Sequence, residues 1–269
     1  MCLILLALDT HPDYALVVAA NRDEFYDRPT ARAGFWSDAP RVLAGRDLKA
    51  GGTWLGTDRS GRFAAVTNYR QGQREPEAPR SRGRLVADYL VGTRDGRAHI
   101  AQVEREAALY NGFNLIAGDV AALFYFSNRE SRPRALAPGI YGLSNHLLDS
   151  PWPKVTVGKS GLTALLSGGG ELLPRLFELL SDSRQAADAA LPRTGVSAEW
   201  ERLLSSAFIA TEGYGTRSST VVLVGRDGAA VFAERSFGPG GAIEGEVRYE
   251  LCFEGPADAN GSPDPTEEG

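Results

Sequence analysis

The chain is poor in the residues that bind metals or form disulfides. Its 269 residues include two cysteines, three histidines and one methionine. Cys2 and Cys252 lie at opposite ends, and the histidines are far apart, so neither a disulfide framework nor a metal-ligand spacing is present. These absences argue against a disulfide-stapled secreted domain and against a metalloenzyme, although a single Cys2–Cys252 bridge remains open.

The chain also has no long hydrophobic run and only a small excess of acidic over basic residues. The apolar run over residues 3–8 has no basic leader and ends at Asp9, which excludes a secretory signal. No run approaches the ~18 apolar residues that a membrane-spanning helix needs. The net charge is −5, and residues 255–269 carry acids but no base, so the rest is nearly neutral and lacks a nucleic-acid footprint. We expect a cytoplasmic protein without a transmembrane segment or a nucleic-acid partner.

The sequence matches neither the phosphate-loop pattern of nucleotide-binding proteins nor the nucleophile elbow of serine hydrolases. Val157-Gly158-Lys159-Ser160 resembles a phosphate loop, but the glycine required five residues before Gly158 is Pro153. No serine lies in a Gly-x-Ser-x-Gly elbow. The sequence therefore supports neither a phosphate-loop protein nor a serine hydrolase.

Hydrophobic periodicity predicts hairpin-linked strands with helices grouped between them. The predicted strands are 3–9, 15–20, a short one with a turn over 51–56, 62–68, 113–117, 121–126, 218–224, 229–235 and 247–253. The predicted helices are 82–92, 97–109, 171–181 and 197–207. This order favours an α+β protein with antiparallel sheets. We expect a single domain over residues 1–254 and a disordered acidic tail over 255–269.

Cys2 stands directly behind Met1 and opens a strand-like run. If Met1 is removed, Cys2 carries both a thiol and the α-amine, so nucleophile and general base come in one residue. The thiol has an ordinary pKa near ~8.5 and the amine one near ~7.7–8.0, which lets the amine take the thiol proton. The alternative is a small buried hydrophobic residue at the start of a strand.

Polar residues at the ends of predicted strands are of the types that an attack of the Cys2 thiol on a carbonyl group needs. They are Arg22, Asp23, Asn68, Asn145 and Arg217. Asparagine and arginine at such places also serve as ordinary turn residues. An amide donor, however, stabilises a developing oxyanion by ~2.7–4 kcal/mol, and a guanidinium beside a thiol favours the thiolate.

Six sequence words around these residues resemble the NRDE family of transport and Golgi organisation protein 2-like proteins. The words are residues 21–24 (NRDE), 51–56 (GGTWLG), 67–69 (TNY), 110–114 (YNGFN), 142–145 (GLSN) and 213–217 (GYGTR). They follow Met-Cys in the family's order, and the resemblance runs to about Phe253. It implies an N-terminal nucleophile (Ntn) hydrolase-like fold, in which four layers, αββα, enclose two antiparallel sheets.

A looser similarity to the cysteine Ntn acylases implies roles for the polar residues. Cys2 would be nucleophile and base, with Arg22 and Asp23 holding the thiolate and the amine. Asn68 and Asn145 would face the oxyanion, and Arg217 would tune the electrostatics of the site. The acylases usually separate their arginine and aspartate by two residues, whereas here the two adjoin. Neighbours on a strand face opposite ways, so either Arg22 or Asp23 is expected outside the site.

Two functions are compatible with this resemblance. The first is a cysteine Ntn hydrolase that cleaves an amide or thioester of a small apolar acyl substrate through Cys2, without a cofactor. The second is a non-catalytic carrier that uses the same pocket, because the family is associated with haem trafficking and with acyl-coenzyme A and lipid metabolism. Haem would then be a transported ligand. The oligomeric state is left open.

Overall fold

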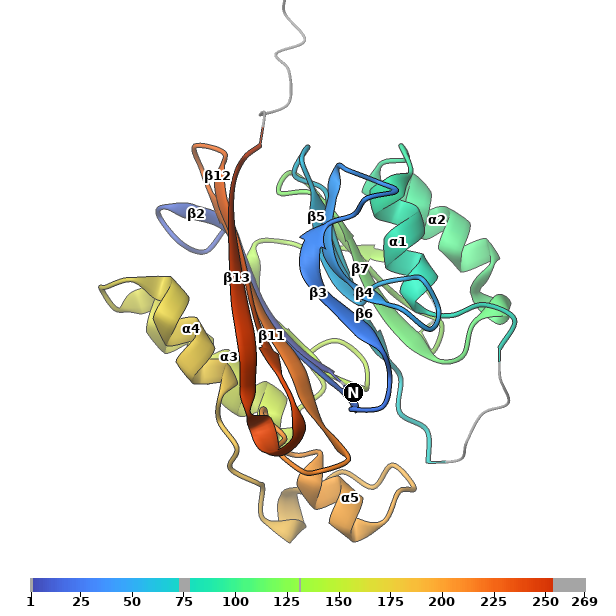
Figure 1. The fold of residues 1–269 in the computed structure, drawn as a ribbon, viewed down its shortest axis with the longest axis vertical. Helices are drawn as coiled ribbons and strands as arrows, with labels where there is room; N and C mark the ends of the chain where they lie inside the picture. Colours follow the sequence, from blue (N-terminus) through green and yellow to red (C-terminus); the bar gives the residue numbers. More distant parts are fainter. Residues whose placement is uncertain (1, 73–77, 131, 254–269) are drawn as a thin grey trace, which may run out of the picture.

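Two antiparallel sheets lie face to face at the centre of the molecule (Figure 1). The computed structural model describes residues 2–72, 78–130 and 132–253. Within them, the first sheet has six strands in the order β10 (Gly139–Leu143), β1 (Cys2–Leu8), β2 (Tyr14–Phe25), β11 (Tyr214–Gly225), β12 (Ala229–Phe237) and β13 (Ile243–Cys252). The second has seven, in the order β3 (Thr30–Phe35), β4 (Val42–Asp47), β5 (Leu55–Asp58), β6 (Phe63–Asn68), β7 (Phe113–Gly118), β8 (Leu123–Ser127) and β9 (Arg134–Ala135).

Helices cover the outer face of each sheet (Figure 1). Helices α3 (Pro153–Ser167) and α4 (Leu172–Leu180) cover the first sheet, and α1 (Gly83–Val91) and α2 (Gly96–Arg105) cover the second. Helix α5 (Ala198–Leu203) and the 3-10 turns η1 (Ala107–Leu109), η2 (Asp188–Ala190) and η3 (Pro239–Gly241) lie in connecting segments. The expected four-layer αββα arrangement is confirmed. In the described part of the chain, the helices are too short or too polar to cross a membrane.

Successive side chains along β1 and β2 point alternately to the core between the sheets and to the helices that cover the first sheet. The even-numbered residues 4–8 of β1 pack in the core between the sheets, whereas the odd-numbered residues 3–7 pack against α3 and α4. The strands pair antiparallel with Cys2 opposite Arg22. Because directly opposed residues share a face, Cys2 and Arg22 both belong to the face between the sheets. Asn21 and Asp23 belong to the helix-covered face.

Buried hydrogen bonds join the two sheets beyond the end of β10. Thr67 on β6 donates its hydroxyl to the carbonyl of Ser144 at 2.6 Å. The Asn114 amide on β7 donates to the carbonyl of His146 at 2.9 Å and accepts from the Tyr125 hydroxyl at 2.9 Å. Burial raises the pKa of Tyr125 to about 12, so its hydroxyl keeps the proton that it donates. The segment after β10 is thereby attached to the second sheet.

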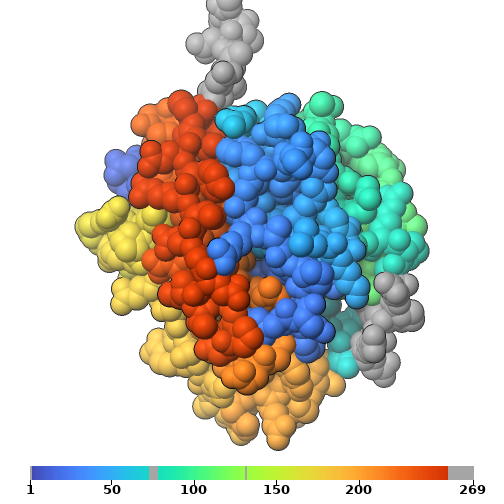
Figure 2. Space-filling model, viewed as in Figure 1, coloured from blue at the N-terminus to red at the C-terminus, as the bar shows by residue number. Residues whose placement is uncertain are grey.

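A second set of contacts joins the two sheets where β12 and β13 lie against β3. The Glu234 carboxylate on β12 accepts from the backbone of Ala33 at 2.8 Å and from the Thr220 hydroxyl at 3.0 Å. Arg32 donates to the carbonyl of Glu244 at 2.6 Å. In Figure 2 the red C-terminal strands lie directly against the blue segment that contains β3 and β4. The first and second sheets are therefore in contact at this edge through polar as well as apolar groups.

The structure differs from the predicted elements in several places. Strand β2 continues through residues 21–24, which the sequence placed in a polar stretch after the strand. Strands β3, β4, β9 and β10 and helix α3 were not among the predicted elements. Helix α3 contains glycines, which have low helix propensity, but a Cβ at Gly158 would lie 2.8 Å from the Leu5 side chain. The close packing of α3 on β1 thus outweighs the low helix propensity of glycine. The tail at 255–269 lies outside the described residues, and the single domain over 1–254 stays a prediction.

We expect Asn114→Ala to lower the free energy of unfolding by about 2–4 kcal/mol, because the buried Tyr125 hydroxyl and His146 carbonyl both lose their partner. Urea denaturation followed by circular dichroism measures the change. Asn68→Ala is the matched control and should change stability by less than about 0.5 kcal/mol, because its side chain is only half-buried. Equal losses in the two variants would contradict this assignment.

Candidate active site around Cys2

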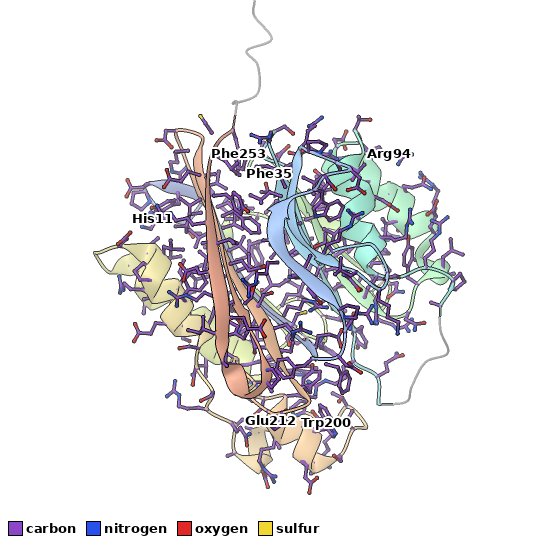
Figure 3. The ribbon with its side chains drawn as sticks, in the orientation of Figure 1. His11, Phe35, Arg94, Trp200, Glu212 and Phe253 are labelled. Atoms are coloured by element: carbon purple, nitrogen blue, oxygen red, sulfur yellow. The ribbon has the colours of Figure 1, made fainter. Side chains whose placement is uncertain are left out.

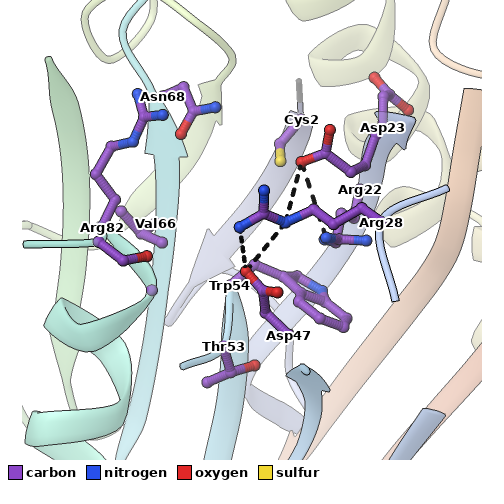
Figure 4. Close-up of a pocket in the computed structure, with 13 residues that line it drawn as sticks. Cys2, Arg22, Asp23, Arg28, Asp47, Thr53, Trp54, Val66, Asn68 and Arg82 are labelled. Atoms are coloured by element: carbon purple, nitrogen blue, oxygen red, sulfur yellow. Dashed lines mark hydrogen bonds and ion pairs between the residues drawn. The ribbon is translucent and has the colours of Figure 1, made fainter. Parts of the chain in front are cut away.

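A pocket of about 120 Å³ opens beside Cys2 at one end of the sandwich (Figure 4). Strands β1 and β2 supply Cys2, Arg22 and Glu24, and the second sheet and the start of α1 supply Asn68 and Arg82. The site therefore forms where both sheets end. Residues from five sequence regions meet in it, so no local stretch of sequence carries the site alone.

Arg22 lies beside Cys2 because the two are cross-strand neighbours. Its guanidinium stacks on the Trp54 ring, 4.3 Å from the ring centroid, and lies 3.9 Å from the Glu24 carboxylate. The ring fits because position 45 is glycine, where a Cβ would lie 2.3 Å from Trp54. Burial raises the pKa of the Cys2 thiol, and the Arg22 charge opposes that rise. Arg22 is thus placed to favour the thiolate.

Asp23 lies on the other face of β2, and its carboxylate points away from the Cys2 sulfur (Figure 4). Thr216 donates its hydroxyl to Asp23 Oδ1 at 2.8 Å, and Lys154 Nζ lies 3.9 Å from Asp23 Oδ2. Burial raises the pKa of Asp23, and the Lys154 ammonium opposes the rise. As expected from strand alternation, Arg22 and Asp23 face opposite ways. Arg22 shares the sulfur's side, whereas Asp23 lies behind the strand.

The main chain of Cys2 is held by residues that follow β10. The Cys2 nitrogen donates to Asn145 Oδ1 at 3.4 Å, and the Ser144 hydroxyl donates to the Cys2 carbonyl at 2.9 Å. Asn145 Nδ2 donates to the carbonyl of Asn68 at 2.8 Å. Both ends of the Asn145 amide are therefore engaged. Its Nδ2 is directed at a backbone carbonyl, and Oδ1 holds the nitrogen that becomes the α-amine when Met1 is removed.

Asn68 is the predicted amide that remains directed at the pocket. Its side chain is half-exposed at the end of β6, and the residue lines both the Cys2 pocket and the neighbouring groove. Within the described residues, no hydrogen bond is recorded for its side-chain amide, whereas its carbonyl accepts from Asn145. Asn145 Nδ2 donates one of its two N–H groups to a backbone carbonyl, whereas the Asn68 side-chain amide makes no hydrogen bond among the described residues.

Arg217 lies in a β-bulge of β11 and acts on the turn after β2. Its Nη1 donates to three backbone carbonyls, those of Phe25, Tyr26 and Arg28, at 3.1, 3.2 and 3.1 Å. It does not line the Cys2 pocket. Its direct contacts shape the turn that carries Arg28 into the pocket, and the electrostatic tuning expected of it stays a prediction.

Three residues at the site were missed by the sequence reasoning: Arg28, Asp47 and Lys154. Arg28 and Asp47 form an ion pair at 2.6 Å on the pocket wall. No spacing in the sequence indicates that pair, since β3 and β4 were not predicted. Lys154 had a weak signal, because Pro151-Trp152-Pro153 marks a helix start and a helix N-terminus disfavours a cation.

The Cys2 pocket adjoins a wider groove of about 390 Å³. The two share Glu24, Asn68 and Arg82. Aromatic rings line the groove: Tyr214 packs edge-on against Phe25 at 5.0 Å and against Trp200 at 5.3 Å. Figure 3 shows Trp200 at the end of the molecule opposite Phe253. A narrow polar pocket at the sulfur thus opens into a broader aromatic surface.

Both cysteines are free thiols, so the bridge that the sequence left open is not formed. Cys252 is exposed on β13, whereas Cys2 is half-buried at the pocket. Among the described residues, no cluster of three or more histidines, cysteines or acids has the arrangement of a metal site.

Comparison with known proteins identifies the family. Residues 1–239 match the family described as Transport and Golgi organisation 2. The chain belongs to this family. Its relatives include the Transport and Golgi organization protein 2 homologs of Bos taurus (43% identical over 259 residues, 88% of this chain and 93% of the relative) and Homo sapiens (40% over 258 residues, 88% and 93%). The Drosophila melanogaster protein is 30% identical over 266 residues, with 88% and 92% covered. The expected NRDE resemblance is confirmed.

Solved structures confirm the fold of this family member. Penicillin V acylase from Agrobacterium tumefaciens is 10% identical, with a TM-score of 0.50 over 88% of this chain and 83% of the acylase. The C2A mutant of conjugated bile acid hydrolase from Clostridium perfringens is 9% identical, with a TM-score of 0.51 over 95% and 94%. At these identities the likeness shows the fold alone, and it is the expected Ntn hydrolase-like fold.

We expect Arg22→Met to raise the pKa of the Cys2 thiol further, because the guanidinium that opposes the burial effect is lost. The thiolate is the nucleophile, so iodoacetamide should alkylate Cys2 about tenfold more slowly near pH 7. The rate is measured against pH in a Cys252→Ser background. Arg235→Met is the control and should leave the midpoint in place, because Arg235 pairs with Glu246 and does not line the Cys2 pocket. An unchanged midpoint in Arg22→Met would rule out this role.

Proposed function

We propose that this family member hydrolyses an amide or thioester of an apolar acyl substrate, with Cys2 as an N-terminal nucleophile. The observation that carries the proposal is the position of both the sulfur and the backbone nitrogen of Cys2. Its sulfur faces a pocket beside Arg22, while its nitrogen is bound to Asn145 Oδ1. Removal of Met1 would turn that nitrogen into an amine without moving it. Nucleophile and base would then lie on the same residue.

In the first step, the neutral α-amine takes the proton of the Cys2 thiol. The sulfur forms a bond to the substrate carbonyl carbon, and the carbonyl oxygen becomes an oxyanion. Asn68 is the proposed oxyanion donor, because its side-chain amide lines the pocket. The C–N or C–S bond of the substrate then breaks, and the α-ammonium gives its proton to the departing amine or thiol. An acyl-cysteine remains.

In the second step, the α-amine takes a proton from water as the water oxygen attacks the acyl-cysteine carbonyl. The C–S bond to Cys2 breaks, the thiol regains the proton and a carboxylic acid leaves. Asn145 Oδ1 accepts a hydrogen bond from the nitrogen in both of its protonation states, and so orients it throughout.

The aromatic groove supports an apolar acyl group as the substrate's larger part. Phe25 is 51% exposed and Trp200 38% exposed on its rim, which is unusual for rings of this size. The narrow pocket is polar and fits the amide or thioester. Both free thiols agree with a reducing compartment, and we keep the cytoplasm as the expected location.

We expect purified protein that lacks Met1 to hydrolyse amide or thioester substrates with acyl chains of graded length. Cys2→Ala should reduce the rate at least about a thousandfold, because the nucleophile is removed. Intact mass spectrometry should detect an acyl adduct on Cys2, and Cys252→Ser serves as the matched control with unchanged rate. Activity that survives Cys2→Ala, or that belongs to chains retaining Met1, would refute the proposal.

A second candidate function is a carrier for haem or acyl-coenzyme A. Burial raises the pKa of the Cys2 thiol, which favours the unreactive protonated form. The groove, at about 390 Å³, is also much larger than the 120 Å³ pocket at the sulfur. Both observations fit a protein that binds a large apolar ligand without attacking it.

For the carrier, titration calorimetry with haem and with acyl-coenzyme A should give saturable binding that survives Cys2→Ser. Trp200→Ala should weaken that binding about tenfold, since a large ring on the groove rim is lost. Val120→Ala, an exposed apolar residue that does not line the groove, is the control and should bind like the wild type. Failure of the wild type to bind either ligand would count against the carrier.

A further inference from the structure

Lys154 is a cation in an unfavourable place. It is the second residue of α3, where the positive end of the helix dipole repels an ammonium. Its side chain is only 1% exposed, and within the described residues Nζ makes no hydrogen bond. An isolated buried ammonium is costly, so a nearby anion must compensate it.

That anion is Asp23, whose Oδ2 lies 3.9 Å from Lys154 Nζ and whose side chain has no exposed surface. Other charged groups lie around the pair. Arg70, which follows β6 and pairs with Glu201 at 2.8 Å, disfavours the Lys154 charge. Burial lowers the pKa of Lys154 and raises that of Asp23, while their mutual attraction opposes both shifts.

The pair lies directly behind Cys2. Strand β2 places Arg22 on the sulfur's face and the next residue, Asp23, on the helix-covered face. Arg22 therefore lies on the sulfur's side of β2, and the Asp23–Lys154 pair lies on the helix-covered side. The Asp23 carboxylate raises the pKa of the thiol and the Asp23 backbone N–H lowers it. Glu24, Tyr214, Arg82 and the Arg28–Asp47 pair are further titratable side chains near this end of the strands.

We propose that Lys154 is a positioning residue of the Cys2 site, which neutralises Asp23 from behind and thereby sets the protonation state of the thiol. Without that ammonium, the Asp23 charge would act on Cys2 and the α-amine without the opposing charge of Lys154, which favours the protonated forms of both. With it, the Lys154 charge opposes that of Asp23, and the thiolate of Cys2 is less disfavoured. The inference rests on Cys2 as the proposed nucleophile, but it concerns the thiol and not turnover.

The test is the pH dependence of Cys2 alkylation by iodoacetamide in Met1-free protein carrying Cys252→Ser. Lys154→Met should move the midpoint up and slow alkylation at pH 7 about tenfold, whereas Asp23→Asn should move it down and speed alkylation by a similar factor. The double variant and Lys154→Arg should both stay near the wild type, because each restores the charge balance. Lys159→Met, on the same helix but paired with Asp149 near the surface, is the control and should leave the midpoint in place.

An unshifted midpoint in folded Lys154→Met overturns the proposal, as does a double variant that resembles Lys154→Met rather than the wild type. If Lys154→Met fails to fold, the midpoint of the double variant is compared with that of Asp23→Asn. The proposal requires the two charges to have opposite effects, so the double variant should have the higher midpoint. The measurement does not need a substrate. A shifted midpoint in a protein without hydrolase activity would therefore support the role of Lys154 while the proposed hydrolysis failed.

Discussion

The pairing of β1 with β2 is the constraint on which the candidate site depends. Cys2 opposes Arg22 across this ladder, so both side chains face the space between the sheets. The same ladder turns Asp23 to the helix-covered face. A slip of one residue would exchange the two faces and bury the wrong charge against the sulfur. The apolar alternation of the two strands, which fills two separate cores, holds the register in place.

The site stays attached to the second sheet through polar contacts. Asn145 links the Cys2 nitrogen to the carbonyl of Asn68 at the end of β6. Behind it, the buried network of Asn114, Tyr125 and Thr67 fixes the segment that carries Asn145. Buried polar groups are costly unless paired, so this network admits few alternative arrangements. The position of the nucleophile is thus tied to contacts between sheets.

Much of the layer architecture was predictable from hydrophobic periodicity. Most of the predicted strands and helices are present, because the strands alternate clearly and the helices have apolar faces. Helix α3 escaped prediction since Gly158 and Gly161 look unfavourable for a helix until their contacts with Leu5 and Leu179 are seen. Strands β3 and β4 were not predicted, because short strands that contain glycine carry little hydrophobic pattern.

The sequence by itself determined the family and the fold class, and it predicted a set of site residues: Cys2, Arg22, Asp23, Asn68, Asn145 and Arg217. These depend on residue types and their order, which are written in the chain. Only the tertiary structure decided that Arg22 faces the sulfur, that Asn145 holds the nitrogen and that Lys154 stands behind Asp23. Those relations join residues up to 143 positions apart, and their directions are set by strand register and helix docking rather than by local pattern.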